Sequence, residues 1–270
     1  MKKYFSYVLL LALCYLLYIN EDSKYIVAGV GIFIIGMYFM EDGFKFFSGG
    51  ILEKLISKST NTTFKSINLG IFATAILQSS SLVSIIVISF LSAKIISLSG
   101  ALGVVFGSAV GTTATTWIVS TLGLKIDIAA FALPMIIFGV IFRFYKNKNL
   151  QGVGNILLGL GFVFLGIGYM KDGFEDLKQG INLAQFAMDG YLGIFVYALI
   201  GMIVTIIIQS SSATLALTIT ALASGQIIYI NALAIAVGAN IGTATTAAMG
   251  AMVSNANSKR MAVGLFIFKG

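Results

Sequence analysis

The chain has 270 residues, of which 58% are hydrophobic and only 10% are charged, whereas ordinary soluble domains have about 25% charged residues. This composition excludes a soluble globular protein and indicates an integral membrane protein. Long apolar runs and a single proline favour helices over a β-barrel, whose strands would alternate in segments of about ten residues. We therefore predict an all-α membrane protein.

The net charge of +7 comes from 17 basic and 10 acidic residues. Most of the basic residues lie in short loops, where they set membrane topology, so we expect no nucleic-acid partner. The chain has no histidine, and its one cysteine, Cys14, cannot form a disulfide framework or a cysteine-based metal site. The sequence shows no nucleophile, base and metal constellation, so we predict neither an enzyme nor a cofactor, and no metal beyond a transported ion.

Residues 1–24 open with Lys2 and Lys3 and continue with an apolar stretch from Tyr4 to Ile19. A signal peptide is the alternative, but the end of the stretch lacks the small residues of a cleavage site. We therefore predict an N-terminal transmembrane helix in residues 1–24, with the N-terminus in the cytoplasm. The protein is then a multi-pass protein of the cytoplasmic membrane.

Two runs of four polar residues interrupt otherwise apolar stretches, and both read Gln-Ser-Ser-Ser. An Asp-Gly-Phe sequence at residues 42–44 recurs at residues 172–174, so the similarity extends beyond the polar runs. We predict two repeats, over residues 25–150 and 151–270. The polar runs are 131 residues apart (209 minus 78) and consist of Gln78, Ser79, Ser80 and Ser81 and of Gln209, Ser210, Ser211 and Ser212.

Loop charges predict that the two repeats have inverted topology. Residues 41–65 carry four lysines and residues 143–150 carry three basic residues, so both segments are expected in the cytoplasm. In the second repeat, residues 171–189 correspond to the first of these segments but carry four acidic residues against two lysines. This loop is therefore expected on the outside.

The number of apolar segments between these loops predicts a re-entrant hairpin. Three such segments, at residues 66–90, 100–122 and 128–142, separate two cytoplasmic loops, so one of them must enter and leave on the same side. The segment with the polar run is the best candidate in each repeat, because a helix broken at a polar turn exposes backbone groups that need a cavity. A continuous helix with a buried polar face is the alternative. Broken helices at corresponding positions of inverted repeats indicate a transporter binding site.

The end of the sequence predicts an incomplete second repeat. Adding 131 to the helix expected at residues 128–145 gives a counterpart at 259–276, whereas the sequence stops at Gly270. Residues 261–268 are typical of the opening of that helix. We therefore expect the last helix to be truncated, or to be completed by something outside the chain.

The polar runs supply the groups that a cotransport site needs. Serine hydroxyls both donate and accept hydrogen bonds, and glutamine offers two N–H donors and a carbonyl acceptor. Together with freed backbone groups, they can bind an oxyanion through donors and a hard cation such as Na⁺ through oxygens. Neither run contains Lys or Arg, so helix N-termini and co-bound cations would offset the charge of an anion.

A stretch rich in glycine and threonine follows each polar run at the same distance. The spacing from the glutamine to a shared glycine is 33 in both copies (111 minus 78 and 242 minus 209). Glycines let a helix break or approach a neighbour closely, and threonines supply oxygen ligands. Small-residue helix packing is the alternative, but the equal spacing favours a functional role.

Both polar runs, the Gly-Ala-Asn-Ile-Gly-Thr stretch at residues 238–243 and its counterpart at 107–112 resemble the type II sodium/phosphate cotransporter family, bacterial branch. The resemblance covers nearly everything after residue 25 and implies a sodium/phosphate symporter that imports inorganic phosphate by alternating access. It implies phosphate binding by the eight residues of the polar runs. It implies sodium binding by Ser80, Ser81, Thr112, Thr113, Ser211, Ser212, Asn240 and Thr243.

Several alternatives stay open. The first repeat has Ala109 where the second has Asn240, which predicts unequal contributions from the two copies. A transporter of another small oxyanion is one alternative, because hydroxyl and amide donors bind any tetrahedral oxyanion. A non-transporting membrane component that senses phosphate is another. The expected partners are inorganic phosphate, Na⁺, the lipid bilayer and a second copy in a homodimer.

Overall fold

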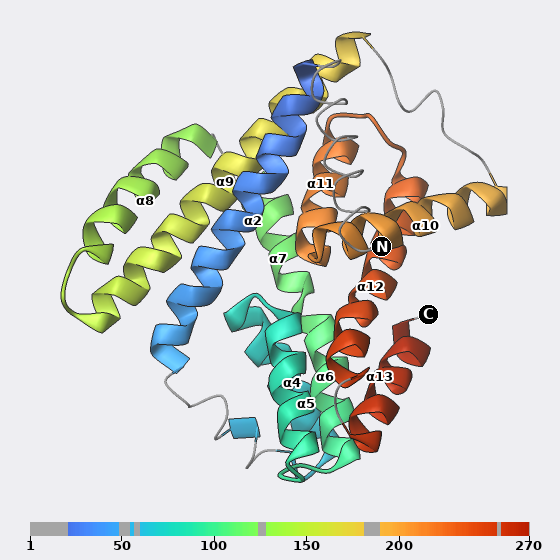
Figure 1. Ribbon diagram of the computed structural model, residues 1–270. Coiled ribbons are helices and arrows are strands. Elements are labelled where there is room, and N and C mark those ends of the chain that lie inside the picture. Colours follow the sequence, from blue (N-terminus) through green and yellow to red (C-terminus); the bar gives the residue numbers. More distant parts are fainter. Residues whose placement is uncertain are drawn as a thin grey trace, which may run out of the picture.

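The computed structural model describes residues 21–48, 55–56, 60–123, 128–180, 190–252 and 255–269. Within these ranges the chain folds into helices joined by turns, and no strand occurs (Figure 1). Most of the N-terminal helix predicted in residues 1–24 lies outside the described residues. The elements are α2 (Glu21–Ser48), α4 (Thr63–Leu77), α5 (Ser80–Ser92), α6 (Leu98–Gly111), α7 (Thr113–Ile118), the π-helical turn η1 (Val119–Gly123), α8 (Ile128–Arg143), α9 (Lys148–Gly180), α10 (Gly190–Ile208), α11 (Ser211–Ala223), α12 (Tyr229–Met252) and α13 (Ala256–Lys269).

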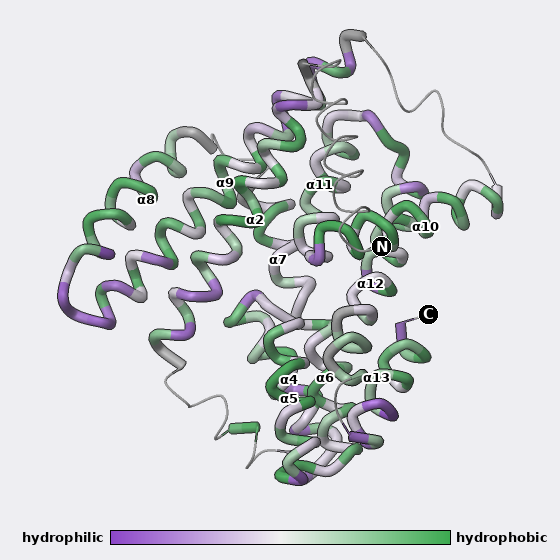
Figure 2. Tube along the Cα trace, in the orientation of Figure 1, coloured by the Kyte–Doolittle hydropathy of each residue, from purple (hydrophilic) through white to green (hydrophobic). Residues whose placement is uncertain are grey.

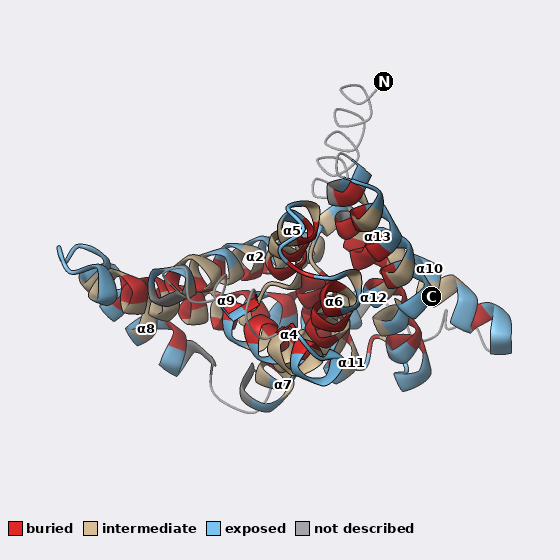
Figure 3. Cartoon of the chain, turned by 90° about the horizontal axis from the view of Figure 1, so that it is seen from below, coloured by how far each residue is buried: buried red, intermediate tan, exposed pale blue. Residues whose placement is uncertain are grey.

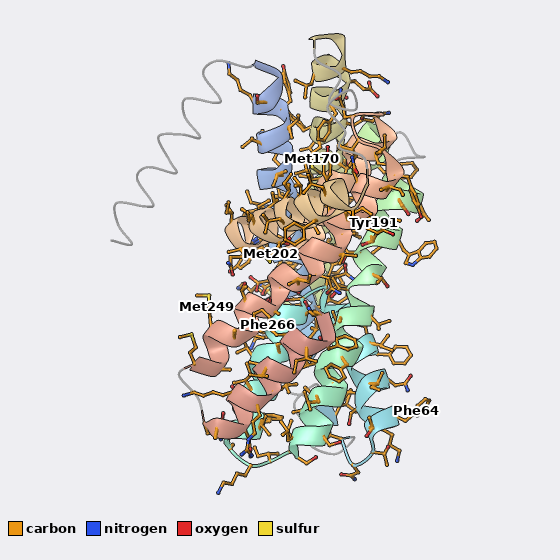
Figure 4. All side chains as sticks on the ribbon, turned by 90° about the vertical axis from the view of Figure 1, so that its right-hand side faces the viewer. Phe64, Met170, Tyr191, Met202, Met249 and Phe266 are labelled. Carbon is orange, nitrogen blue, oxygen red and sulfur yellow. The ribbon has the colours of Figure 1, made fainter. Side chains whose placement is uncertain are left out.

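Five stretches of the described chain are long and apolar enough to cross a membrane. Hydrophilic residues gather at the α8–α9 turn and at the lower end of α2, whereas the helix bodies are mainly hydrophobic (Figure 2). Large apolar side chains such as Phe64 and Tyr191, 78% and 93% exposed, project away from the helices (Figure 4). The protein is therefore an all-helical integral membrane protein. The five stretches are Ser23–Phe46, Leu98–Thr121, Lys148–Lys178, Gly190–Ile208 and Tyr229–Met249.

Helices α2 and α9 lie side by side along a stripe of glycines (Figure 1). A Cβ added at Gly29 would lie 2.7 Å from the carbonyl oxygen of Gly166, and one at Gly36 would lie 2.7 Å from that of Gly159. The partner numbers fall along α9 as they rise along α2, so the two helices run antiparallel. Only glycine permits such close backbone contact between helices.

The glycines that meet between α2 and α9 occupy equivalent positions in the two predicted repeats. At an offset of 130, Gly29 corresponds to Gly159 and Gly36 to Gly166. Gly29 meets Gly166 while Gly36 meets Gly159, so each helix presents the same surface to the other. The two helices therefore contact each other through equivalent glycines.

A second close helix pair is built twice, once in each repeat. In α4 and α6, a Cβ at Gly107 would lie 2.0 Å from the carbonyl oxygen of Ile67. In α10 and α12, a Cβ at Gly238 would lie 1.8 Å from that of Ala198. Both residues of the second pair are 131 positions after those of the first. Helix pairs at equivalent positions of the two predicted repeats thus make equivalent close contacts.

The chain between α4 and α6 forms a hairpin that returns to its starting end. Gly107 meets Ile67 and Gly111 meets Ile71, so residue numbers rise together and α4 runs parallel to α6. Helix α5, which connects them, must therefore run back. In agreement, the α6 residue Gly100 packs against Thr60, just before α4. In the second repeat, α10 and α11 form the corresponding hairpin, and α10 runs parallel to α12. The first helix of this hairpin is longer, because α10 has 19 residues and α4 has 15.

The buried core crosses the boundary between the repeats. Met261 and Leu265 of α13 join Val83, Val87 and Val104 of the first repeat in one cluster of buried residues. In the view from below, buried residues gather along the centre, while α8 and α10 carry exposed residues at the outside (Figure 3). Helix α13 occupies the segment in which the opening of the last helix was expected.

Candidate functional site

Both polar runs begin where a helix breaks at glutamine. Helix α4 ends at Gln78, which has the left-handed backbone angles φ 54° and ψ 22°, and Gln209 after α10 has φ 60°. This conformation costs a non-glycine residue about 1–2 kcal/mol. Each side chain offsets part of this cost by capping the helix, because the Gln78 amide donates to the carbonyl oxygen of Ala75 and the Gln209 amide to that of Ile206, both at 2.5 Å.

The first serine of each run starts the next helix. Ser79 and Ser210 have extended backbone angles and cap α5 and α11. Their Oγ atoms accept hydrogen bonds from the backbone N–H of Leu82 and Ala213, both at 3.2 Å. The N–H groups of the first helical residues have no partner within a helix and carry the positive end of its dipole. Each run therefore presents a helix N-terminus, which favours an anion.

The two runs face one shared cavity of about 240 Å³. All eight residues of the polar runs line it, although the two runs are 131 positions apart in the sequence. A cavity of this size holds several water molecules or a small hydrated ion. Its walls come from α2, from the two hairpins and from α12: Ile34, Met37, Tyr38, Glu41, Gln78, Ser79, Ser80, Ser81, Gln209, Ser210, Ser211, Ser212 and Thr243.

Thr115 of α7 connects the two runs by hydrogen bonds. Its Oγ1 donates to Oε1 of Gln78 at 2.7 Å, and Oγ of Ser212 donates to Thr115 Oγ1 at 3.5 Å. Thr115 is only 3% exposed. The nitrogen of the Gln78 side chain donates to the end of α4, and its oxygen accepts from Thr115. Both polar atoms of the Gln78 side chain are therefore fixed by hydrogen bonds.

The two copies contribute unequal hydrogen bonds. In the second copy, Thr205 Oγ1 donates to Thr214 Oγ1 at 2.9 Å. The equivalent first-copy positions are Thr74 and Val83 (205 and 214 minus 131), and Oγ1 of Thr74 is buried without a hydrogen-bond partner among the described residues. The two polar runs therefore lie beside different hydrogen-bond arrangements.

Of the additional sodium candidates, Thr243 alone lines the cavity. Its Oγ1 donates to the carbonyl oxygen of Asn240 at 2.6 Å and accepts from Nζ of Lys269. Thr112 donates to the carbonyl oxygen of Ser108, Thr113 is exposed and donates to that of Val110, and Asn240 is exposed. Their role in sodium binding stays a prediction.

Three residues of the site were not found by sequence reasoning. Glu41 lines the cavity from α2, Thr115 bridges the two runs, and Lys269 contacts a lining residue. Thr115 belongs to a repeated stretch, which was a signal. For Glu41, the only signal is a difference between the copies, since the aligned residue is Lys171.

A comparison with known families decides the classification. The family model described as Na+/Pi-cotransporter matches residues 32–172 and 183–269. The chain belongs to this family. The match confirms the family resemblance of the polar runs, and it covers both hairpins and all the residues that line the cavity.

Curated bacterial proteins are similar to this chain. YjbB of Escherichia coli (strain K12) is 29% identical over 248 residues, covering 91% of this chain and 44% of YjbB, and is named for inorganic phosphate export. YqeW of Bacillus subtilis (strain 168) is 30% identical over 239 residues, covering 87% of this chain and 75% of YqeW, and its name assigns no function. The chain spans less than half the length of YjbB. No solved structure matches the chain.

Proposed function

We propose that the chain is a sodium-coupled secondary transporter of inorganic phosphate and that the cavity between the polar runs is its substrate site. The observation that carries this proposal is that all eight polar-run residues, with the N-termini of α5 and α11, line one cavity. Two helix N-termini and a set of hydroxyl and amide donors suit a small oxyanion. Phosphate is the oxyanion of the family to which the chain belongs.

The charge of the lining residues supports coupling to a cation. Among the described residues, the lining includes no Lys or Arg and one acid, Glu41. Lys269 does not line the cavity but contacts the lining residue Thr243. An anion that enters this cavity therefore needs more positive charge than two helix ends supply. The hydroxyl and amide oxygens of the polar runs are suitable ligands for Na⁺, by analogy with other hard cations. A sodium ion bound beside the anion would complete the anion site, and this dependence couples the two fluxes.

The packing of α2 against α9 supports inverted repeats. Both helices are long enough to span a membrane, they are equivalent in the two repeats, and they run antiparallel through reciprocal glycine contacts. Two equivalent helices that cross in opposite directions give inverted topology. In the first repeat, the α4–α5 hairpin begins and ends at the same end, as a re-entrant segment does. Alternating access then corresponds to rocking of one repeat against the other around the cavity.

The direction of transport has two candidates. We expect import, because an inward sodium gradient drives a symporter inward. Export is the second candidate, because YjbB is named for inorganic phosphate export. The two differ in how the flux responds to sodium: a symporter reverses when the sodium gradient is reversed, whereas a sodium-independent exporter does not.

Phosphate flux into proteoliposomes tests the proposal. The full chain is reconstituted, and uptake of labelled inorganic phosphate is measured with an inward sodium gradient, with an outward one, and with potassium replacing sodium. We expect uptake only with the inward sodium gradient. A Gln209→Ala variant should lose most of this uptake, whereas Gln151→Ala, which changes a half-buried glutamine in the α9 N-terminal turn outside the cavity, should retain it.

The other hypotheses predict different results. Phosphate binding that does not depend on sodium, together with no uptake under any gradient, would favour the sensor. Sodium-driven uptake of another oxyanion in preference to phosphate would favour the broader oxyanion transporter. Release of preloaded phosphate without any response to sodium would favour an uncoupled exporter.

A further inference from the structure

Among the described residues that line the cavity, Glu41 is the one that carries a charge. It lies on α2, whose residues Ile34, Met37 and Tyr38 form the rest of that wall. The other polar groups of the lining are hydroxyls, glutamine amides and the N-termini of two helices, each of which can donate a hydrogen bond. A carboxylate accepts hydrogen bonds and cannot donate them. Glu41 therefore adds a charged acceptor to a site built mainly from donors.

An ion pair holds the Glu41 side chain at the cavity. Nζ of Lys45, one turn along α2, lies 3.0 Å from Oε1 of Glu41. The Glu41 side chain is 24% exposed, whereas that of Lys45 is 42% exposed. Glu41 lines the cavity and Lys45 does not, so the pair links a lining residue to a more exposed lysine.

The second repeat has the same ion pair with its charges exchanged. The position aligned with Glu41 is Lys171, which pairs with Glu175 at 3.8 Å, and both side chains are about half exposed. Neither residue lines the cavity. The described lining therefore contains a single carboxylate, contributed by the first predicted repeat.

A single carboxylate in an oxyanion site rich in donors distinguishes anions that carry a proton from anions that carry none. Phosphate and arsenate keep at least one O–H group near neutral pH and can donate it to a carboxylate, whereas sulfate keeps none. A fully deprotonated anion would place an unprotonated oxygen against the Glu41 charge, with no hydrogen bond between them. Sites that bind a hydroxyl through buried polar groups reject analogues that lack it, because the site's own groups are then unpaired.

Building on the proposed function, we infer that Glu41 is the specificity-determining residue of the cavity. It accepts a hydrogen bond from the O–H of a protonated tetrahedral oxyanion and excludes sulfate. The hydroxyl and amide donors alone leave the identity of the oxyanion open, and Glu41 restricts it to the phosphate and arsenate class.

Competition against labelled phosphate tests this assignment. Sodium-dependent binding of labelled inorganic phosphate to the full chain is measured with increasing arsenate or sulfate. The wild-type chain should be displaced by arsenate and not by sulfate. A Glu41→Gln variant, whose amide can donate to sulfate, should narrow the preference for phosphate over sulfate by about tenfold or more, since a hydrogen bond to a charged group has at least this effect. Glu41→Asp should keep the preference.

Asp42→Asn is the matched control. Asp42 is the next residue on α2 and pairs with the same lysine at 3.2 Å, but it does not line the cavity. This variant loses one carboxylate and weakens the same ion pair, and it should leave the preference unchanged. Equal shifts in Glu41→Gln and Asp42→Asn would show an effect of the surface charge and overturn the assignment.

Other outcomes separate this assignment from the proposed function. Sulfate that displaces phosphate from the wild-type chain as well as arsenate does would overturn the role of Glu41 without any variant. A Glu41→Gln variant with an unchanged phosphate-to-sulfate ratio and a changed sodium dependence would identify Glu41 as a sodium ligand instead. A wild-type chain that binds no phosphate would refute the proposed function, and the assignment would fall with it.

Discussion

Replacing Thr115 by valine tests whether the link between the polar runs sets the affinity of the site. Valine has nearly the same shape as threonine, so the change removes the hydroxyl and little else. Gln78 Oε1 loses a donor at 2.7 Å, and Ser212 Oγ loses an acceptor at 3.5 Å. The first bond has the normal length for O–H···O and the second is long, so the first dominates. A net hydrogen bond contributes about 0.5–1.5 kcal/mol.

This free energy corresponds to a loss of about two- to tenfold in phosphate affinity. Sodium-dependent binding of labelled phosphate measures the loss, with Thr121→Val as the control, because the hydroxyl of Thr121 is exposed, donates to the carbonyl oxygen of Trp117 in its own helical turn and does not line the cavity. A double-mutant cycle sharpens the test: Thr115→Val and Gln78→Ala should couple by about 1 kcal/mol, whereas Thr115→Val and Ser212→Ala should be nearly additive. Additivity in the Gln78 cycle would refute the proposed link.

Three further predictions concern packing, capping and topology. Gly238→Ala places a Cβ 1.8 Å from a backbone oxygen, so it should destabilise the protein in detergent by about 1–3 kcal/mol, measured by thermal unfolding. Gly31→Ala has open space around the added Cβ and should leave the stability unchanged or raise it slightly. Equal melting temperatures of the Gly238→Ala and Gly31→Ala variants would contradict the packing argument. Ser210→Ala removes the cap of α11 and should cost about 0.5–2 kcal/mol of stability and weaken phosphate binding, whereas unchanged binding would argue against an anion at this helix end. In a background without the native cysteine, single cysteines at Lys45 and Asp176 should be labelled from opposite sides of the membrane, and labelling from the same side would break the inverted topology.

The helix breaks at the two polar runs could be predicted because their signals are local. Four polar residues in an apolar stretch conflict with a lipid-exposed helix wherever they occur, and two matched runs point to one site. The structure adds the reason why the first residue is glutamine: its amide caps the helix that ends at Gln78 and its oxygen is free to accept from Thr115. A serine at this position could not reach both partners.

Glu41 and Lys269 could not be assigned to the site from the sequence, because their role depends on how distant helices pack. Glu41 is 37 residues before the first polar run (78 minus 41), and it precedes an Asp-Gly-Phe sequence that is typical of a helix end. In the structure, α2 continues through this sequence to Ser48, so Glu41 stays on a helix beside the cavity. Lys269 reaches Thr243 only because α13 packs against α12.

The lengths of the hairpin helices place the cavity within the electric field of the membrane. Helices of 15 and 13 residues in the first hairpin are about 20 Å long, against a hydrocarbon core of about 30 Å. Under the proposed inverted topology, the first hairpin enters the core from one face and the second, whose α10 has 19 residues, reaches at least as far from the other face, so the two hairpins overlap inside the core. An ion that arrives at the cavity from either face then crosses about half of the membrane potential, which corresponds to about 1 kcal/mol per unit charge at 100 mV. A cycle that moves net charge will carry a current, and the ratio of sodium to phosphate can be measured from that current.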